Sequence, residues 1–262
     1  MRDASAFLGA WPFAGCPPAN LADLIAAYQT VGIDGAALSP VEAVLQPEPM
    51  SANLRLVTLI EALAGEDFRV WAVPIINPSL PGWEEHLAIC RQAGGGLVRA
   101  IKIVPAYHDY ALDHPALEQL ALACLEDGLG LCVQVRMEDE RMHHARMHVP
   151  RVEPAAVVTL AQRCPTLPIL VCGSYMAELA AYRETPTIRA ELSFVESGNL
   201  LPDALRHLGA DRLLIGTHTP IHMIAPNAAK LTSDVLDAAT AARLGSENFD
   251  RFFSTGTWPY VR

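Results

Sequence analysis

The sequence has no long apolar run, no cluster of basic residues and no Cys-x-x-Cys pair. Its longest apolar stretches, such as Val70–Ile76, are far shorter than the roughly 20 residues that a membrane span needs, so we expect no membrane partner. The chain carries 19 Lys and Arg residues against 29 Asp and Glu residues, a formal charge of -10. Because this field repels a polyanion and no local basic patch offsets it, we expect no nucleic-acid partner.

The cysteines are widely scattered and lack zinc-ribbon spacing. They are Cys16, Cys90, Cys124, Cys132, Cys164 and Cys172. Such thiols pack as small hydrophobic groups, whereas disulfide frameworks belong to small secreted domains, so we expect mostly buried thiols. The first residues, Met-Arg-Asp-Ala-Ser, reach polar and Gly or Pro residues too soon for the apolar core of a signal peptide. The expected location is the cytoplasm.

The 262 residues show a repeated order of a short β-branched run, a polar turn and an amphipathic helical stretch. This alternation indicates parallel strands with crossover helices. Strands are expected to begin near Arg2, Asp34, Arg69, Val98, Leu131, Pro168, Thr187 and Arg212. Eight units of about 33 residues each match the size of one βα unit with its loops, which predicts a single (β/α)8 barrel domain over 1–262.

Local signals place several of the helices. Asn20 is a good N-cap for a helix that ends near Gly32, and Pro115 stands in the first turn of a helix that begins after Asp113. A third helix is expected from Ser51 to Gly65. The only glycine triplet precedes the fourth strand rather than following the first, which disfavours a nucleotide-binding sheet. In a barrel, functional residues belong at the carboxyl ends of the strands.

The segments at these strand ends are similar to those of a known superfamily. They are Asp3–Phe13, Ile101–His108, Val133–His144 and Ile215–Pro220, followed by Glu247–Phe253. Together they resemble the amidohydrolase superfamily, in particular the amidohydrolase-related branch with decarboxylases of aromatic and amino-muconate acids and lactone hydrolases. A closer resemblance is to an uncharacterised sub-branch without the His-x-His metal motif, which shares the Trp-Pro-Phe start, the Glu-Asp-Glu-Arg segment and the Gly-Thr/Ser-His ending.

The resemblance implies a metal site, but the residues at the ligand positions differ from the family pattern. The two histidines of the first strand are replaced by Ser5 and Phe7. Arg136 and Cys172 stand at the histidine positions of strands 5 and 6, and His218 stands at the aspartate position of strand 8. A guanidinium would repel a divalent ion, so no metal and no other cofactor is expected. The alternative is zinc or manganese held by shifted ligands among His108, His143, His144 and His218.

The remaining groups suggest a cationic site with Arg136, Lys102 and His218 as catalytic residues. Arg136 could fork onto a substrate carboxylate, Lys102 could add a second charge, and His218 could move a proton near neutral pH. Lys102 matches a lysine that is carbamylated between two metals in some relatives, and it could equally be a lysine tethered by a carboxylate. The expected substrate-binding residues are Ser5, Trp11, His108, Gln134, Glu138, Asp139, His143 and Glu191.

Most of these residues also have a purely structural interpretation. Arg136 could form a buried ion-pair network with Glu138, Asp139 or Glu191, and His108 could cap a turn. A buried thiol is favoured over a nucleophile for Cys172. A solvated loop that could act as a lid carries Arg141, His143, His144, Arg146 and His148. An apolar substrate wall, a barrel plug or an interface could be formed by Trp11, Phe13 and Trp258.

The sequence therefore predicts a hydrolase, or a related lyase such as a decarboxylase, for a small carboxylate or lactone substrate. Two further hypotheses stay open. One is a catalytically silent barrel that binds a small anionic ligand or a partner, and the second is a metal-dependent hydrolase with shifted ligands. Superfamily analogy favours a homo-oligomer.

Overall fold

A computed structural model of the chain describes residues 1–13, 15–63, 68–143, 146–147, 149–232 and 236–253. The strands are β1 (Arg2–Leu8), β2 (Gly35–Pro40), β3 (Arg69–Ala72), β4 (Ala100–Ile103), β5 (Gly130–Gln134), β6 (Ile169–Cys172), β7 (Ile188–Glu191) and β8 (Leu213–Leu214). Each strand begins within two residues of the position that the sequence predicts. None of the described helices combines the length and the hydrophobicity that a membrane span requires.

The strands form a closed ring. Strands β1 to β3 pair in parallel in one sheet and β4 to β8 in another. Backbone hydrogen bonds join the two sheets at both seams: Lys102 N donates to Pro74 O at 2.8 Å and Ile76 N to Lys102 O at 3.0 Å, while Ala4 N donates to Ile215 O at 2.9 Å. The predicted parallel (β/α)8 barrel is confirmed.

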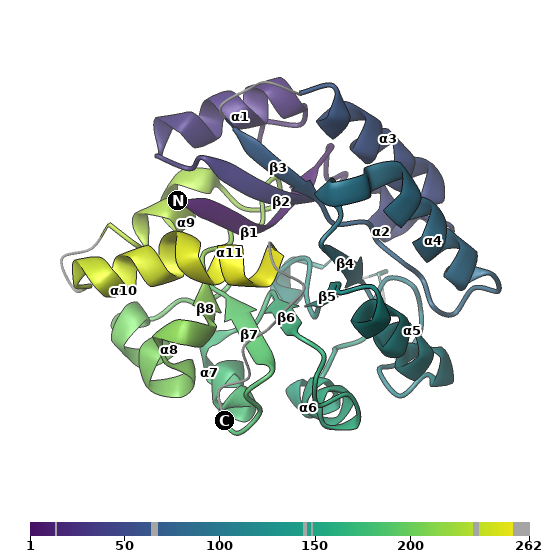
Figure 1. The fold of residues 1–262 in the computed structure, drawn as a ribbon. Helices are drawn as coiled ribbons and strands as arrows, with labels where there is room; N and C mark the ends of the chain where they lie inside the picture. Colours follow the sequence, from purple (N-terminus) through teal and green to yellow (C-terminus); the bar gives the residue numbers. More distant parts are fainter. Residues whose placement is uncertain (14, 64–67, 144–145, 148, 233–235, 254–262) are drawn as a thin grey trace.

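Helices surround this ring (Figure 1). They are α1 (Leu21–Thr30), α2 (Glu42–Leu45), α3 (Met50–Glu61), α4 (Trp83–Gly94), α5 (Pro115–Glu126), α6 (Pro154–Arg163), α7 (Met176–Leu179), α8 (Leu200–Leu208), α9 (Ile224–Ala229), α10 (Ala238–Ala242) and α11 (Asn248–Phe253). As predicted, the Asn20 side chain caps α1 by accepting from Asp23 N at 2.9 Å. The N-cap of α5 is His114, whose ring nitrogen accepts from Ala116 N at 3.3 Å, and Pro115 stands in the first turn as predicted.

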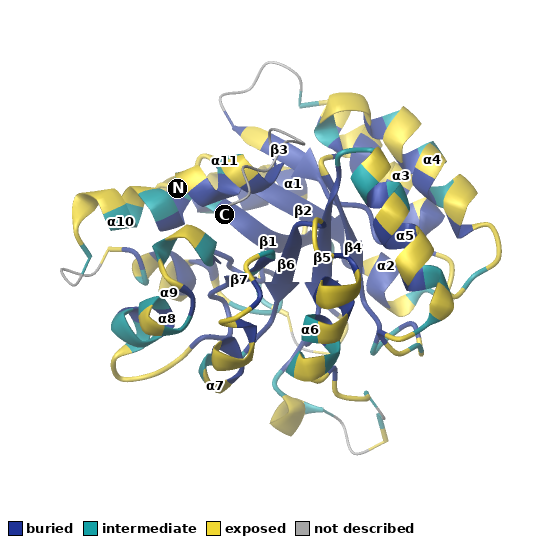
Figure 2. Cartoon of the chain, turned by 60° about the horizontal axis from the view of Figure 1, so that its bottom comes forward, coloured by how far each residue is buried: buried dark blue, intermediate teal, exposed yellow. Residues whose placement is uncertain are grey.

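Buried side chains fill the space between the strands and the helices and also the inside of the ring, which α11 closes at one end. Figure 2 shows buried strands at the centre and helices whose outer faces are exposed. Inside the ring, Phe249, Phe252 and Phe253 of α11 pack against buried residues of the strands, among them Trp71 and Cys132. Gly130 opens β5 directly beneath the Phe252 ring, which a Cβ atom would approach to 2.6 Å. Helix α11 therefore closes the amino ends of the strands and leaves the carboxyl ends for a site.

Candidate functional site

Lys102 places a cation inside the barrel. Its side chain extends inward from β4 and is only 1% exposed. The ammonium Nζ lies 3.4 Å from Ser5 Oγ and 4.1 Å from the centre of the Phe7 ring. Among the described residues, no ion pair with a carboxylate within 4.0 Å includes Lys102. Buried charges are usually paired, so this ammonium is suited to hold an anionic oxygen of a ligand.

His218 supplies a neutral base beside this cation. Its Nε2 lies 2.8 Å from the Met137 carbonyl oxygen, which can only accept, so Nε2 carries the proton and Nδ1 keeps its lone pair. Nδ1 is buried and has no hydrogen-bond partner among the described residues. Burial, followed by the charges of His222 and Lys102, lowers the pKa of His218 well below its usual value. The φ angle of 55° at His218 is a strained conformation of the kind that clusters at functional sites.

Aromatic rings enclose the imidazole. The ring centre of His218 lies 5.3 Å from that of Phe7 and 5.0 Å from that of Phe194, both in edge-to-face geometry. Trp11 packs on Tyr107 at 5.9 Å in the same buried cluster as Phe7. Because Trp11 lies at the carboxyl end and α11 occupies the opposite end, Trp11 does not plug the bottom of the barrel.

Several buried polar atoms at the carboxyl ends of the strands lack partners among the described residues. Besides His218 Nδ1, they include Ser39 Oγ, Gln134 Oε1 and Thr219 Oγ1. The amide Nε2 of Gln134 donates to the Arg136 carbonyl oxygen at 2.6 Å, so its oxygen is the group left for a ligand. Ser39, Thr219, Phe194 and His222 are absent from the sequence-based set, because only the barrel brings their strand ends together.

Glu191 is a fixed carboxylate rather than a free ligand. Its Oε1 accepts from Gly173 N at 2.7 Å and from Ser193 Oγ at 2.8 Å, and its Oε2 accepts from Ser193 N at 2.6 Å. It is fully buried, and within the described part of the chain Arg136 pairs with other carboxylates. Glu191 therefore anchors the ends of β6 and β7 beneath the site.

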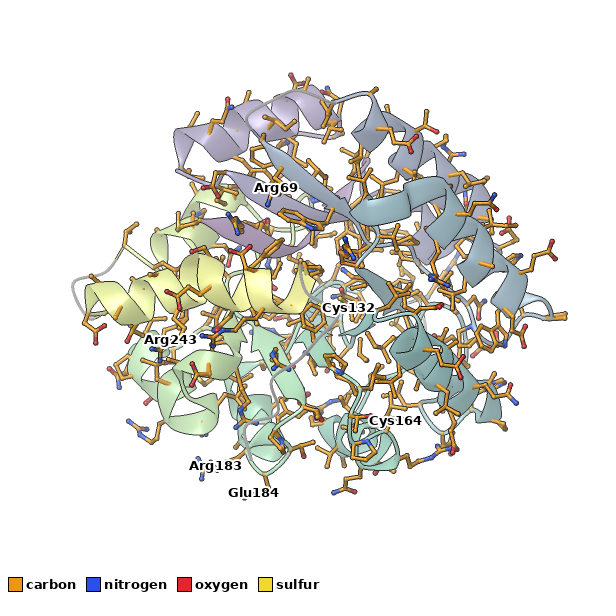
Figure 3. All side chains as sticks on the ribbon, viewed as in Figure 1. Arg69, Cys132, Cys164, Arg183, Glu184 and Arg243 are labelled. Atoms are coloured by element: carbon orange, nitrogen blue, oxygen red, sulfur yellow. The ribbon has the colours of Figure 1, made fainter. Side chains whose placement is uncertain are left out.

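Two thiols face each other in the interior. Cys172 and Cys132 are both buried, and Figure 3 shows Cys132 near the middle of the ring of strands. Burial acts to raise the pKa of the Cys172 thiol, but the Cys132 thiol and the Lys102 ammonium outweigh it and the pKa lies below its usual value. The described thiols are free, as the sequence suggested.

The Arg136 guanidinium is not free to bind a substrate carboxylate. Its Nη1 and Nη2 lie 3.1 and 2.9 Å from the two carboxylate oxygens of Glu178, and Nη2 also contacts Glu140 at 3.2 Å. The guanidinium stacks on the Tyr175 ring at 3.7 Å. The structural interpretation, a buried ion pair, thus describes Arg136, but the partner is Glu178 instead of Glu138, Asp139 or Glu191.

The remaining predicted residues lie around the mouth and are not gathered on His218. His108 Nε2 contacts the Ala43 carbonyl oxygen at 2.9 Å, and burial lowers its pKa, in keeping with a structural turn. Asp139 accepts from Arg141 at 2.7 Å, and this contact lowers the pKa of its carboxyl group. Glu138 is buried near Tyr107, and His143 is half-buried. His144, His148 and Trp258 lie outside the described residues.

Solved structures with this arrangement of strands and helices include decarboxylases. The 5-carboxyvanillate decarboxylase of Sphingomonas paucimobilis aligns with a TM-score of 0.71 at 15% identity, over 97% of this chain and 98% of its own. The dihydroxybenzoic acid decarboxylase of Polaromonas sp. JS666 gives 0.68 at 16% identity over 96% of each chain. An amidohydrolase of Staphylococcus aureus gives 0.70 at 10% identity, over 97% of this chain and all of its own. This chain matches no protein-family model and no curated protein.

The expectation that the site has no metal cofactor is contradicted by these structures. The Polaromonas enzyme holds manganese together with an inhibitor, 2-nitroresorcinol. A structure of the 5-carboxyvanillate decarboxylase of Novosphingobium aromaticivorans also contains manganese. The physical argument from Arg136 fails as well, because Glu178 neutralises the guanidinium that was expected to repel an ion.

The side chains present in this barrel do not fit that ion. Manganese prefers carboxylate, carbonyl, water and imidazole ligands, whereas the ligand positions here hold Ser5, Phe7, Cys172 and His218 next to the Lys102 ammonium. The described residues contain no group of three or more His, Cys, Asp or Glu side chains that could hold a metal. In fold, however, the resemblance is confirmed: the chain is a (β/α)8 barrel of the kind shared by amidohydrolases and these decarboxylases.

Proposed function

We propose that this protein is an enzyme that acts at the carboxyl-derived carbonyl group of a small aromatic substrate, by hydrolysis of a lactone or ester. One observation supports the proposal: the buried Lys102 ammonium and the neutral His218 imidazole both pack against the aromatic ring of Phe7. Both groups stand at the carboxyl ends of their strands, where (β/α)8 enzymes place their chemistry.

Lys102 is the electrostatic group of the proposed reaction. In a water-poor interior, a fixed cation stabilises the negative charge that develops on a carbonyl oxygen far more than it would in bulk water. Ser5, at 3.4 Å from Nζ, holds the ammonium in place. The rings of Phe7, Phe194 and Trp11 provide apolar surface for an aromatic substrate.

His218 is the proton-transfer group. Nδ1 accepts a proton from water while the water oxygen bonds to the carbonyl carbon and the C=O electron pair moves onto the oxygen beside Lys102. When that pair returns, the carbon–oxygen bond of the ester or lactone breaks, and the proton passes from Nδ1 to the departing oxygen. The Met137 carbonyl keeps the imidazole in the required tautomer throughout.

Decarboxylation is the second candidate, and the fold neighbours favour it. The Sphingomonas and Polaromonas proteins are decarboxylases of aromatic acids. In that reaction the bond between ring and carboxyl carbon breaks, carbon dioxide leaves, and the ring carbon takes a proton. Lys102 would anchor the substrate carboxylate, and its ammonium is the buried proton donor available beside it. No step of either reaction as proposed runs through a metal ion.

The test is a substrate panel of aromatic lactones, aryl esters and hydroxybenzoates, assayed by liquid chromatography and carbon dioxide release. Each assay is run with and without added manganese, since fold neighbours bind it. We expect turnover of a lactone or ester, and a loss of at least about 100-fold in kcat for His218→Asn, the usual scale for a general base.

The matched control is His207→Asn, a histidine on the outer helix α8 that contacts Arg183. This variant should keep full activity. Carbon dioxide release without ester hydrolysis would show that the reaction is decarboxylation and not hydrolysis. Turnover that persists in both His218→Asn and Lys102→Met would show that this site does not catalyse the reaction. The absence of turnover with every substrate would favour a catalytically silent barrel that binds a ligand.

A further inference from the structure

A separate cavity lies on the same face of the barrel. Its volume is about 370 Å³, within the range of small-molecule sites. It opens between the segment that follows β4 and the segment that leads into α6. The lining residues are Pro105, Ala106, Asp109, Tyr110, Ala111, Leu112, Pro150, Arg151, Val152, Glu153 and Ala156. Most of this wall is apolar, and it includes none of the side chains assigned to the proposed reaction.

Tyr110 adds a polar group to this apolar wall. Its hydroxyl oxygen is buried and has no hydrogen-bond partner among the described residues. Burial raises the pKa of Tyr110 well above its usual value, so the hydroxyl keeps its proton. An unpaired buried hydroxyl costs free energy, which a ligand atom that accepts the O–H would recover.

The cavity lining carries one cation, Arg151, and two carboxylates, Asp109 and Glu153. The Arg151 Nη2 lies 3.1 Å from Glu178 Oε1, and its Nε lies 3.4 Å from Glu153 and 3.9 Å from Glu140. These carboxylates leave the guanidinium little attraction for an anion. The lining carboxylates would repel an anion, and an ammonium could not accept a hydrogen bond from the Tyr110 hydroxyl, so a neutral ligand is favoured.

We infer that this cavity binds a small uncharged molecule with an apolar body and one oxygen that accepts a hydrogen bond from the Tyr110 hydroxyl. The inference stands independently of the proposed reaction, because it uses a different cavity and different side chains. Leu112, Val152 and Ala156 contact the apolar body, and Arg151 stays in its pairs with Glu178 and Glu153.

The experiment compares three probes that share a phenyl ring and a short chain: 2-phenylethanol, 2-phenylethylamine and phenylacetate. Binding to the full chain is measured by calorimetry, and the site is located by crystallography with the bound probe. We expect 2-phenylethanol to bind at least about 5-fold more tightly than the amine or the carboxylate, because the lining carboxylates repel the anion and the ammonium cannot accept the hydrogen bond of Tyr110. Tyr110→Phe should weaken its binding about 2- to 10-fold, the scale of one neutral hydrogen bond.

Two substitutions on α6 form a matched pair. Ala156→Phe fills the cavity and should abolish binding of 2-phenylethanol, whereas Ala155→Phe puts the same ring on the exposed neighbour and should leave it unchanged. Tyr110→Phe should not lower the melting temperature, since it removes an unpaired hydroxyl. Tighter binding of either charged probe, equal binding to the Ala156→Phe variant, or no binding of 2-phenylethanol would overturn the inference.

Discussion

Arg136 and Glu178 form a two-pronged ion pair inside the carboxyl end of the barrel, with Nη2 to Oε1 at 2.9 Å and Nη1 to Oε2 at 3.1 Å. The side chains are only 3% and 6% exposed. Glu178 also accepts from Tyr175 N at 2.8 Å, so the pair links the end of β5 to the start of α7. Arg136, which the sequence suggested as a substrate-binding residue, is thus part of a structural ion pair that joins two segments.

Removal of one partner of this pair should destabilise the fold. Arg136→Ala removes the buried partner of Glu178 and leaves only the half-exposed Arg151 beside its carboxylate. Breaking a buried ion pair typically costs about 3–5 kcal/mol. Urea unfolding followed by circular dichroism measures the change, and Arg206→Ala on the surface of α8 serves as the control. An Arg136→Ala protein with unchanged stability and lost substrate binding would return this residue to the role that the sequence suggested.

Asp3 should make stability depend on pH. The carboxyl group is buried between β1, α1 and the segment after β8, and this burial raises its pKa from 3.8 to about 6 against the hydrogen bonds of Thr217 and Tyr28. Because the native state holds its proton more tightly than the unfolded state, the stability that this group contributes is fully present below about pH 4 and is lost as the pH rises through about 6. The loss amounts to about 3 kcal/mol.

The comparison that isolates this effect is Asp3→Asn, which keeps an acceptor for Thr217 N and cannot ionise. Unfolding free energies are measured at several values between about pH 4 and pH 7, the window set by the two pKa values. The variant should lack the part of the slope that the Asp3 carboxyl group gives the wild-type protein in this window. Parallel profiles for the two proteins would show that the carboxyl group titrates normally.

Lys102→Met should separate function from stability. The substitution replaces a buried ammonium that no carboxylate of the described residues pairs within 4.0 Å by an apolar side chain of similar length. Because burial of an unpaired charge is costly, stability should stay equal or rise by about 1–3 kcal/mol, while turnover falls. Differential scanning calorimetry and the substrate panel provide the two measurements. A large drop in melting temperature would mean that Lys102 is part of the scaffold.

Gly216→Ala should destabilise the barrel, because there is no space for an added Cβ atom at this position. An added Cβ would lie 2.3 Å from Glu191 Oε2 and 2.8 Å from its Cδ. Hydrogen bonds from Gly173 and Ser193 hold that carboxylate, so it cannot swing away, and we expect a loss of about 1–3 kcal/mol. Gly198→Ala, where nothing lies within 4 Å of the new atom, is the control in the same unfolding assay. Equal stability of the two variants would contradict the rigid placement of Glu191.

Local signals in the sequence placed most of the fold. Strand onsets follow from runs of β-branched residues, and the cap at Asn20 follows from a side chain that reaches only three residues ahead. Pro115 marks the start of α5, because proline is tolerated in the first turn of a helix. The alternation of strands and helices was sufficient to predict the parallel barrel.

The site was predictable only in part, for a reason that particular contacts make clear. Position on or after a strand made Ser5 in β1, Lys102 in β4 and His218 beyond β8 candidates, because the chain alone decides which residues each strand carries. The direction of Arg136 depends on Glu178, 42 residues away, and the tautomer of His218 on the Met137 carbonyl, 81 residues away. Backbone patterns arise from neighbours in sequence, whereas buried polar groups take whichever partner the packed barrel brings within hydrogen-bond distance, and only the tertiary structure determines that choice.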